Sequence, residues 1–157
     1  MTTIIRLAKQ KDIPALERLL RQIAELHHKS RPDIFISGGQ KYTTEALEKM
    51  LTYEDFPIFV AADENDEVQG YCFCQVRNIN HPVIRNYLSL FIDDFCVDET
   101  LRGQGIGKKL FAAAKEYAKE CGAYNIELNV WAVNEGAVKF YEDFGFNPKT
   151  IGMELIL

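Results

Sequence analysis

The sequence contains no uninterrupted apolar stretch of the length that a membrane-spanning helix requires, about 20 residues. Its first six residues, Met1 to Arg6, lack the apolar core of a secretory signal. Internal repeats and low-complexity segments are also absent. These absences predict a cytoplasmic protein with no membrane partner.

Cysteines in the paired spacing of a zinc site are absent too. The four that occur each lie inside an apolar strand-like or helix-like pattern: Cys72, Cys74, Cys96 and Cys121. Such positions favour buried thiols in a reducing compartment. We therefore expect no metal site.

Positive charge is not in excess, because the formal net charge is −5, and this argues against a nucleic-acid partner. Residues 101–120, by contrast, carry more positive than negative charge. They carry Arg102, Lys108, Lys109, Lys115 and Lys119 against Glu116 and Glu120. A basic segment in an acidic protein fits a bound polyanion at this place.

The chain has 157 residues, of which 47% are hydrophobic and 26% charged, as in an ordinary globular protein. This length is enough for one domain, residues 1–157, with its own core.

Hydrophobic periodicity predicts four helices and six strands. Helices are expected from Asp12 to near His28, from Thr44 to about Tyr53, from Ile106 to Cys121 and from Glu135 to Phe144. Asp12 and Asn134 are expected to cap the first and last of these. Strands are expected over residues 2–7, 57–62, 68–77, 88–97, 125–131 and about 150–157, with residues 78–86 as a loop. The order predicts a mixed α/β sheet, antiparallel in its first half, with a parallel crossover between residues 88 and 131.

The segment Leu101 to Lys108 is the most informative about function. Its glycines at 103, 105 and 107 leave backbone N–H groups free to point at a ligand, where a predicted helix begins. Free amides, the positive end of the helix dipole and the flanking Arg102 and Lys108 together suit a phosphate group.

The glycine spacing excludes two common phosphate loops. A dinucleotide fingerprint requires a third glycine where Lys108 stands, and a Walker A loop requires a hydroxyl residue where Lys109 stands. The pattern that does match is Arg/Gln-x-x-Gly-x-Gly/Ala, with Arg102 or Gln104 in first place. It resembles the coenzyme A pyrophosphate loop of the GNAT superfamily of N-acetyltransferases.

The resemblance covers nearly the whole chain and is strongest from Ile92 to Phe146. It implies the GNAT fold, with a mixed, mostly antiparallel sheet of about six or seven strands, splayed between strands 4 and 5, and about four helices on both faces. It also implies acetyl-CoA as co-substrate, bound by backbone groups of Phe95, Cys96 and Val97 and by the loop residues Arg102, Gly103, Gln104, Gly105, Ile106, Gly107 and Lys108.

Asn134 to Phe146 is similar to the superfamily stretch N-x-x-A-x-x-F-Y-x-x-x-G-F. The likeness implies that Asn134 contacts the cofactor arm and that Tyr141 protonates the leaving thiolate. A phenol with a pKa near 10 can donate to a thiolate whose conjugate acid has a pKa near 8.5.

An acceptor amine arrives as an ammonium and needs a general base. The run Asp93-Asp94-Phe95-Cys96-Val97 resembles the acidic-acidic-aromatic-x-Val run of polyamine N-acetyltransferases, which points to Asp93. Adjacent strand residues face opposite sides, so only one of the two acids should face the cleft. Asp94, Glu127 and a water chain remain alternatives. In the ribosomal-protein acetyltransferases of the superfamily a glutamate base stands where this chain has Asn129.

The acceptor pocket is the least defined part of the sequence. Its candidate residues are His27, His28, Arg31, Asp33, Phe35, Tyr42, Arg85, Trp131 and Glu154. The leading interpretation is direct acetyl transfer from acetyl-CoA to the primary amine of a small molecule in a ternary complex. The alternatives are acetylation of a protein or peptide amine and a non-catalytic acyl-CoA-binding module. A homodimer is expected only from likeness to the superfamily.

Overall fold

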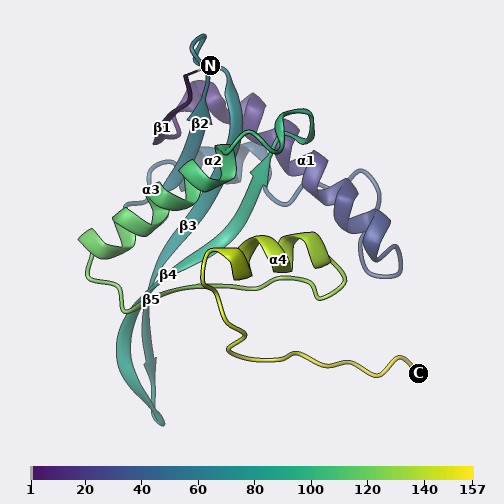
Figure 1. Cartoon of the computed structure of the whole chain (residues 1–157), viewed down its shortest axis with the longest axis vertical. Helices are drawn as coiled ribbons and strands as arrows, with labels where there is room; N and C mark the ends of the chain where they lie inside the picture. Colours follow the sequence, from purple (N-terminus) through teal and green to yellow (C-terminus); the bar gives the residue numbers. More distant parts are fainter. Residues whose placement is uncertain (1) are drawn as a thin grey trace.

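The computed structural model describes residues 2–157. Its centre is a five-stranded sheet in the order β1-β2-β3-β4-β5 (Figure 1). The strands are β1 (Ile4–Leu7), β2 (Ile58–Ala62), β3 (Val68–His81), β4 (Ile84–Val97) and β5 (Asn125–Leu128). The helices are α1 (Ile13–Ser30), α2 (Thr44–Met50), α3 (Ile106–Glu120) and α4 (Glu135–Asp143). None of them has the length and apolar character of a membrane span within residues 2–157.

The sheet is antiparallel from β1 through β4, and β5 joins β4 in parallel. The parallel pairing is short, from Ser89↔Asn125 to Ile92↔Leu128. This mixed α/β arrangement confirms the predicted fold class and the predicted crossover through α3.

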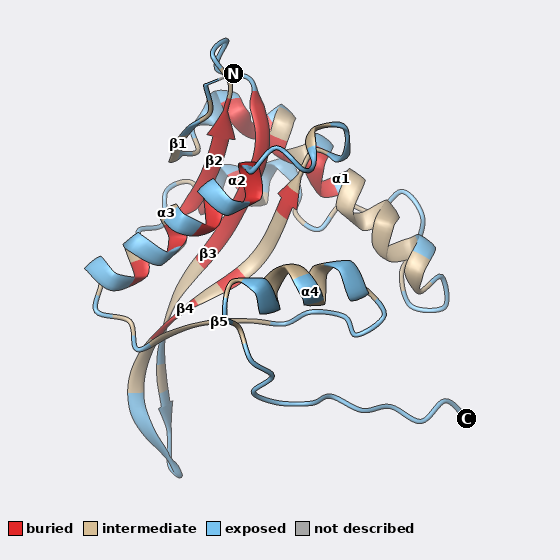
Figure 2. Cartoon of the chain, viewed as in Figure 1, coloured by how far each residue is buried: buried red, intermediate tan, exposed pale blue. Residues whose placement is uncertain are grey.

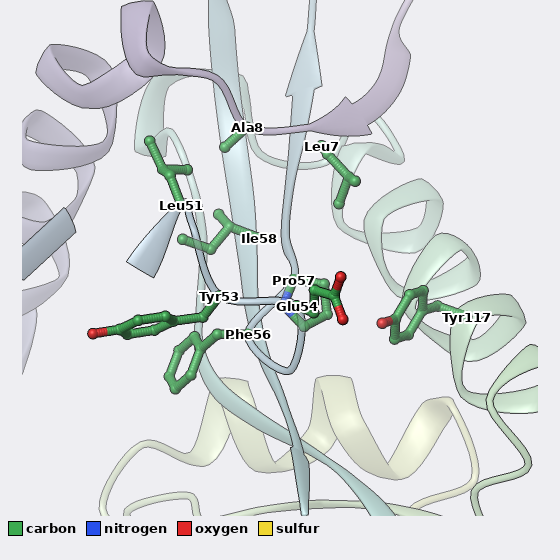
Figure 3. A pocket seen from close by; sticks show the side chains of 9 residues that line it. All are labelled: Leu7, Ala8, Leu51, Tyr53, Glu54, Phe56, Pro57, Ile58 and Tyr117. Carbon is green, nitrogen blue, oxygen red and sulfur yellow. The ribbon is translucent and has the colours of Figure 1, made fainter. Parts of the chain in front are cut away.

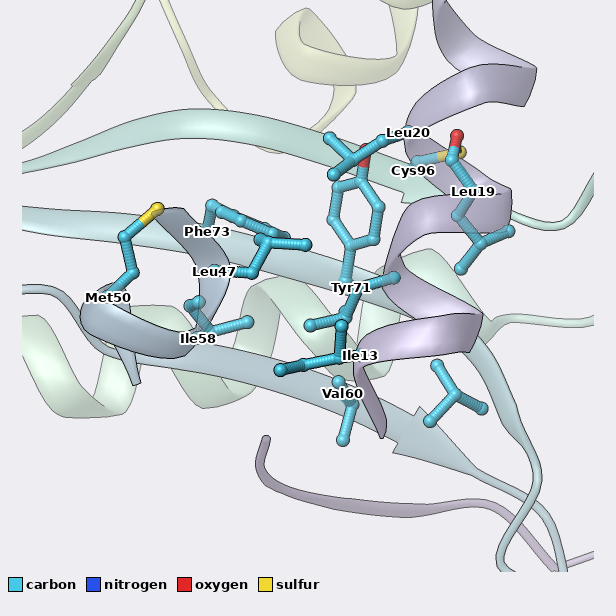
Figure 4. Close-up of a cluster of buried hydrophobic side chains, with 12 residues drawn as sticks. Ile13, Leu19, Leu20, Leu47, Met50, Ile58, Val60, Tyr71, Phe73 and Cys96 are labelled. Atoms are coloured by element: carbon cyan, nitrogen blue, oxygen red, sulfur yellow. Dashed lines mark hydrogen bonds between the residues drawn. The ribbon is translucent and has the colours of Figure 1, made fainter. Parts of the chain in front are cut away.

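Two layers of buried side chains hold the helices on opposite faces of the sheet. One cluster joins α1 and α2 to Val60, Tyr71 and Phe73 (Figure 4). The other joins α3 to the alternate strand residues, such as Ala61 and Cys72. The two clusters form because neighbouring side chains in a strand point to opposite faces of the sheet.

The hairpin of β3 and β4 is longer than predicted. Residues 78–86 were expected to form a loop, yet the ladder continues to His81↔Ile84 and only Pro82 and Val83 make the turn. Proline was read as a sign of a loop, whereas here it stands at the turn, where its missing N–H costs no ladder hydrogen bond.

The predicted cap at Asp12 was wrong in detail. Pro14 does lie in the first turn of α1, but the Asp12 side chain makes no capping hydrogen bond to that helix. Its carboxylate instead accepts hydrogen bonds from Arg6 and from the Lys9 N–H, both at 2.7 Å.

The strand predicted at about 150–157 does not form, so the sheet has five strands rather than the six or seven expected. The alternation of apolar residues is present, but a strand also needs a neighbouring strand for its backbone hydrogen bonds. Residues 147–157, which we call the C-terminal arm, run away from the sheet in an extended path (Figure 1).

The arm leaves apolar side chains in water. Ile151, Met153, Leu155 and Ile156 are between 74% and 92% exposed. An ion pair between Arg31 and Glu154 at 2.8 Å ties the arm to the end of α1. A pair at the surface contributes little to stability, whereas burying one large aliphatic side chain is worth about 1.5–3 kcal/mol.

Burial is uneven along the chain. All of the buried residues lie before residue 121, and residues 121–157 are half-buried or exposed throughout (Figure 2). The segment that contains β5 and α4 is therefore attached to the body by the pairing of β5 with β4 and by partly buried apolar side chains, among them Ile126, Phe144 and Phe146.

Candidate active site

A β-bulge in β4 shapes the centre of the site. Phe73 of β3 pairs with Asp94 and the next residue, Cys74, pairs with Ile92, so Asp93 is the extra residue. Ile92 lies in the cluster beneath α3, and so does Phe95, three residues later. Residues three apart in a regular strand point to opposite faces of the sheet, so their shared face is the result of one inserted residue.

The bulge brings both acids to Lys41, although the alternation of strand residues had led to the expectation that only one would face the cleft. Lys41 Nζ lies 3.3 Å from Asp93 Oδ2 and 3.5 Å from Asp94 Oδ2. It also donates a hydrogen bond of 2.9 Å to the backbone oxygen of Asp93. The strict alternation behind that expectation fails wherever a strand carries an extra residue.

Two tyrosines complete the set of donors to the acids. The Tyr42 hydroxyl donates to the Asp93 carboxylate, and the Tyr71 hydroxyl donates to Asp94 Oδ1 at 3.0 Å. Of these groups, the sequence had suggested Tyr42 as a pocket residue, but neither Lys41 nor Tyr71. Lys41 lies 52 residues from Asp93 in the chain, and no local pattern signals such a contact.

Asp94 is well placed to accept a proton. Burial raises the pKa of Asp94 above its ordinary value, while Lys41 and the Tyr71 hydrogen bond oppose that effect. A buried carboxylate with a raised pKa accepts a proton more readily than an ordinary aspartate. The side chain of Asp94 is 11% exposed and that of Asp93 is 16% exposed.

Beside the bulge, β4 presents a backbone edge that its neighbour leaves open. Pairing with β5 stops at Ile92↔Leu128, while β4 continues to Val97. Phe95, Cys96 and Val97 thus lie on the part of β4 that β5 does not reach, as the predicted splay required. Backbone N–H and C=O groups of such an edge can pair with an extended ligand that carries amides.

The Cys96 side chain does not face this open edge. Its thiol lies against α1, with Sγ 3.7 Å from the Leu19 oxygen, and is 2% exposed as a residue. Burial raises the pKa of the thiol to about 12. A protonated, inward-facing thiol does not suit a covalent acyl intermediate.

The glycine loop follows β4 directly and leads into α3. Gly103 and Gly105 have φ angles of 80° and 81°, in the left-handed region that favours glycine. Space above both is open, since a Cβ built on either would meet no heavy atom within 4 Å. Gly105 caps α3 without any side-chain hydrogen bond, which leaves the first N–H groups of the helix available to a ligand.

The third glycine has a different role from the other two. Gly107 is inside α3, where a Cβ would lie 3.0 Å from the Phe140 ring of α4. It permits the close approach of α4 rather than an unusual backbone angle. Ile106 is buried beside it, while Arg102, Gln104 and Lys108 are not buried and surround the loop.

Helix α4 places Tyr141 next to the open edge. Asn134 caps the helix as predicted, with its Oδ1 accepting from the Ala137 N–H at 3.1 Å. The Tyr141 ring meets Phe95 of β4 at 6.3 Å and Phe146 at 5.7 Å between centroids. Burial raises the pKa of the Tyr141 phenol, so it stays protonated and can donate.

Glu127, an alternative base, is engaged elsewhere. Its carboxylate accepts from Tyr87 at 2.9 Å and from Lys149. It pairs in register with Phe91, on the strand segment before the bulge. The acids at the bulge are therefore better placed than Glu127 beside the open edge.

Several acceptor candidates form one aromatic wall. Phe35 stacks on His27 with ring centroids 4.9 Å apart and meets the edge of Trp131 at 5.0 Å. Arg31 lies 6.0 Å from the centre of the Trp131 ring and pairs with Asp33 and Glu154. Burial lowers the pKa of His27, although Asp94 opposes this.

The wall links the loop after α1 to the loop after β5. His28 supports it through a 2.7 Å hydrogen bond between its Nδ1 and the Phe35 oxygen. Arg85 is not part of it, because it lies exposed on the outer half of the β3–β4 hairpin.

A separate pocket lies elsewhere, near the start of β2 (Figure 3). Its walls are Leu7, Ala8, Leu51, Tyr53, Glu54, Phe56, Pro57, Ile58 and Tyr117. It contains no residue of the bulge or of the glycine loop. Among residues 2–157, no group of His, Cys, Asp and Glu side chains has the arrangement of a metal site.

The chain is similar to known proteins in both sequence and fold. The model of the Acetyltransferase (GNAT) family matches residues 20–146. The crystal structure of a mutant BH1408 protein from Bacillus halodurans superimposes with a TM-score of 0.94 at 33% identity, covering 98% of this chain and 99% of that one.

Relatives with acetyltransferase names include the following two. The uncharacterized N-acetyltransferase MJ1207 of Methanocaldococcus jannaschii is 34% identical over 103 residues, which are 66% of this chain and 45% of that protein. The chain thus matches less than half of the length of MJ1207. The thialysine N-epsilon-acetyltransferase of Sus scrofa is 26% identical over 156 residues, covering 95% of this chain and 86% of the relative.

Proposed function

Because the chain belongs to the Acetyltransferase (GNAT) family, we propose that it transfers an acetyl group from acetyl-CoA to the primary amine of a small molecule. The observation that carries the proposal is the open edge at Phe95–Val97. It lies between the acids of the bulge on one side and the glycine loop on the other. In this arrangement the amine binds at the acids, the thioester arm lies along the open edge and the pyrophosphate binds at the glycine loop.

The glycine loop binds the pyrophosphate in this proposal. The N–H groups at the start of α3 donate hydrogen bonds to the phosphate oxygens. The positive charges of Arg102 and Lys108 attract the doubly anionic pyrophosphate. The backbone of Phe95, Cys96 and Val97 pairs with the amides of the pantetheine arm. Asn134 holds the arm from the other side through the amide nitrogen that its capping bond leaves free.

The acids prepare the amine. An ammonium group approaching the bulge gives a proton to one carboxylate, and the free amine then attacks the acetyl carbon. The new C–N bond forms as the C–S bond breaks, and Tyr141 gives its proton to the departing thiolate. The acetylated nitrogen then loses its second proton to solvent, and a proton from solvent restores the Tyr141 phenol. A backbone N–H of the open edge stabilises the negative charge that develops on the carbonyl oxygen. The products are the acetamide and free coenzyme A.

Lys41 already fills the place of a cation between the acids. An acceptor ammonium has to share or take that place. The aromatic wall of His27, Phe35 and Trp131 gives the rest of the acceptor an apolar side to lie against. The likeness to the thialysine N-epsilon-acetyltransferase of Sus scrofa supports a small amine as acceptor.

The test is release of free coenzyme A thiol from acetyl-CoA with a panel of small amines, diamines and peptides. We expect turnover above hydrolysis with at least one small amine. Turnover only with peptides would favour a protein acceptor. Bound acetyl-CoA without turnover for any amine would favour a non-catalytic module.

Tyr141→Phe tests the assigned acid. Removing the proton donor should lower kcat by about 10²-fold or more and change the dissociation constant of acetyl-CoA little. Tyr124→Phe is the matched control, because Tyr124 is 80% exposed and outside the site. Equal kcat for Tyr141→Phe and the wild-type protein would refute the acid role.

A further inference from the structure

Lys41 lies where the proposed reaction needs its acceptor amine. Its Nζ is 3.3 Å from Asp93 Oδ2 and 3.5 Å from Asp94 Oδ2, and it donates a 2.9 Å hydrogen bond to the Asp93 backbone oxygen. Three oxygen atoms of the bulge thus surround the ammonium group. The ε-amine of a lysine is a primary amine, which is the chemical group that the acids are proposed to prepare for attack. The chain therefore carries an acceptor amine inside its own site.

The residues around Lys41 hold its backbone against the sheet. The ring of the neighbouring Tyr42 stacks on Phe73 with centroids 5.8 Å apart, and the Tyr42 hydroxyl donates to the Asp93 carboxylate. Gln40 donates a 2.7 Å hydrogen bond to the Tyr42 backbone oxygen. The Lys41 amine itself lies 5.6 Å from the centre of the Tyr42 ring. This packing presents the amine at the bulge in a defined position, which is the condition for a fast intramolecular reaction.

The open edge of β4 is within reach of this amine. Phe95 follows Asp93 by two residues, which is roughly 7 Å along a strand. An attacking nitrogen has to come within about 3–3.5 Å of the carbonyl carbon. The ammonium of a lysine is carried on a flexible four-carbon stem, and the Lys41 side chain is 42% exposed. Rotation of the side chain can cover the remaining distance while the backbone stays in place.

We propose that the chain acetylates its own Lys41, in an intramolecular reaction with the acetyl-CoA that it binds. The reaction rests on the proposed function, since it uses the same acids, open edge and glycine loop. It differs from that function in its acceptor, which belongs to the chain and is modified once per molecule. Tethering favours it, because the amine does not have to be recruited from solution.

The step uses groups that the site already provides. One carboxylate of the bulge takes a proton from the Lys41 ammonium, and the free amine attacks the acetyl carbon of the thioester. The C–N bond forms, the C–S bond breaks, and the Tyr141 phenol gives a proton to the departing thiolate. The amide nitrogen and the carboxylate each release a proton to solvent, and one proton from solvent restores the phenol. One thioester and one ammonium thus become one acetamide, one thiol and one proton.

Acetylation changes the charge at the bulge. Acetyl-lysine is neutral, so the modified Lys41 no longer offsets the charges of Asp93 and Asp94. Self-acetylation thus removes the cation with which an external ammonium has to compete for the two acids.

The first measurement locates the acetyl group. The purified protein is incubated with isotope-labelled acetyl-CoA and digested, and the label on each lysine is followed by mass spectrometry. Lys41 should acquire label faster than Lys139, whose side chain is 79% exposed at the surface, by about 10²-fold or more. Lys41→Arg should lose this label, and Lys49→Arg, at an exposed position of α2, should keep it. Label on Lys41 that appears no faster than on Lys139 would overturn the proposal.

The second measurement tests whether the reaction is intramolecular and uses the bound thioester. At saturating acetyl-CoA, the rate constant for labelling Lys41 should not change when the protein is diluted a hundredfold. Added free coenzyme A should compete for the same cleft and slow the labelling of Lys41 but not that of Lys139. A rate constant that falls in proportion to protein concentration would mean that one copy modifies another. That result, or equal labelling with and without free coenzyme A, would reject self-acetylation.

A chemical reagent measures the intrinsic reactivity of the lysines without acetyl-CoA. Limiting acetic anhydride should modify Lys139 before Lys41, because the Lys41 side chain is less exposed and its amine is surrounded by the oxygens of the bulge. The order of modification should therefore reverse between the two acetyl donors. If acetic anhydride also modifies Lys41 first, the lysine is reactive by itself and the proposal fails.

The outcome separates from that of the proposed function. Labelling of Lys41 with no turnover of any external amine would support self-acetylation and reject a small amine as acceptor. Turnover of a small amine by a protein whose Lys41 stays unlabelled would support the proposed function and overturn self-acetylation.

Discussion

At the scale of single residues, the two acids of the bulge have different tyrosine partners, Tyr42 for Asp93 and Tyr71 for Asp94. Lys41 contacts both, but burial acts strongly on Asp94 and raises its pKa. The likeness to polyamine acetyltransferases pointed to Asp93 as the base. The structure adds a physical reason to consider its neighbour, so the two roles should be separated experimentally.

The pH profile of kcat/KM separates them. A base must be unprotonated to act, so kcat/KM of the wild-type protein should fall as pH decreases through the pKa of that base. If Asp94 is the base, Asp94→Asn should lower kcat/KM by about 10²–10⁴-fold and flatten the acidic limb. In that case Asp93→Asn should still show the decrease of kcat/KM at acidic pH. The reverse pattern would assign the role to Asp93.

Asp12 is a residue whose importance is structural. Burial alone would raise its pKa, but the Arg6 hydrogen bonds and charge and the Lys9 amide outweigh burial, so the pKa of Asp12 lies below its ordinary value. A depressed pKa stabilises the fold at pH above the unfolded value. That stabilisation is lost as pH falls through the folded value.

Asp12→Asn should therefore lower the free energy of unfolding by about 1.5–3 kcal/mol at pH 7, because Arg6 and the Lys9 N–H lose a charged acceptor, while Arg6 keeps Asp66. The difference from the wild-type protein should shrink when urea unfolding is repeated near pH 3. Asp143→Asn is the control, since Asp143 meets Lys139 only at the surface, at 3.7 Å. Its effect should stay within about 0.5 kcal/mol. A pH-independent effect at Asp12 would contradict the ion-pair account.

At the scale of elements, the loop between β4 and α3 depends on backbone angles rather than on side chains. Gly105 has a φ of 81° and begins α3. Alanine in this conformation costs about 1–2 kcal/mol. Because the surrounding space is open, strain rather than a clash is the effect of substitution.

Gly105→Ala should lower the melting temperature and weaken acetyl-CoA binding, measured by calorimetry. Gly136→Ala is the matched control inside α4. A Cβ there meets only Asn134 Oδ1, at 4.0 Å, and alanine favours a helix over glycine by about 1 kcal/mol. It should keep or raise the melting temperature. Equal behaviour of the two variants would mean that the loop does not require the left-handed angle.

At the scale of the whole molecule, stability is concentrated in one part. The buried clusters contain residues of α1, α2, α3, β2, β3 and β4, whereas α4 contains no buried residue. Regions with few buried apolar contacts open locally at lower free energy than the core. The part of the site that contains Tyr141 should therefore be the less stable part.

Hydrogen exchange without ligand should show this difference. Amides in the middle of α3 should exchange near the rate of global unfolding, and those of α4 should exchange faster. Addition of acetyl-CoA should slow exchange in α4 more than in α3, because the proposed site bridges α4 to the body. Equal protection of the two helices without ligand would refute the uneven stability.

Local chemistry determined a large part of this protein by sequence alone. Helical spacing and caps such as Asn134 located four helices, because those signals act within a few residues. The glycines at 103 and 105 located the loop, since their conformational freedom belongs to the residue itself. The motif from Asn134 to Phe146 placed Tyr141 in the same way, although its catalytic role remains a proposal.

Only the tertiary structure decided the features that depend on partners far away in the chain. The bulge at Asp93 exists because β3 fixes the register of β4, and it brings both acids to Lys41. Lys41 reached the acids through a loop that no local pattern connects to them. The arm had the alternation of a strand, yet a strand forms only where another backbone offers its hydrogen bonds. Sequence periodicity records which faces of a segment are apolar, and the fold alone decides what lies against them.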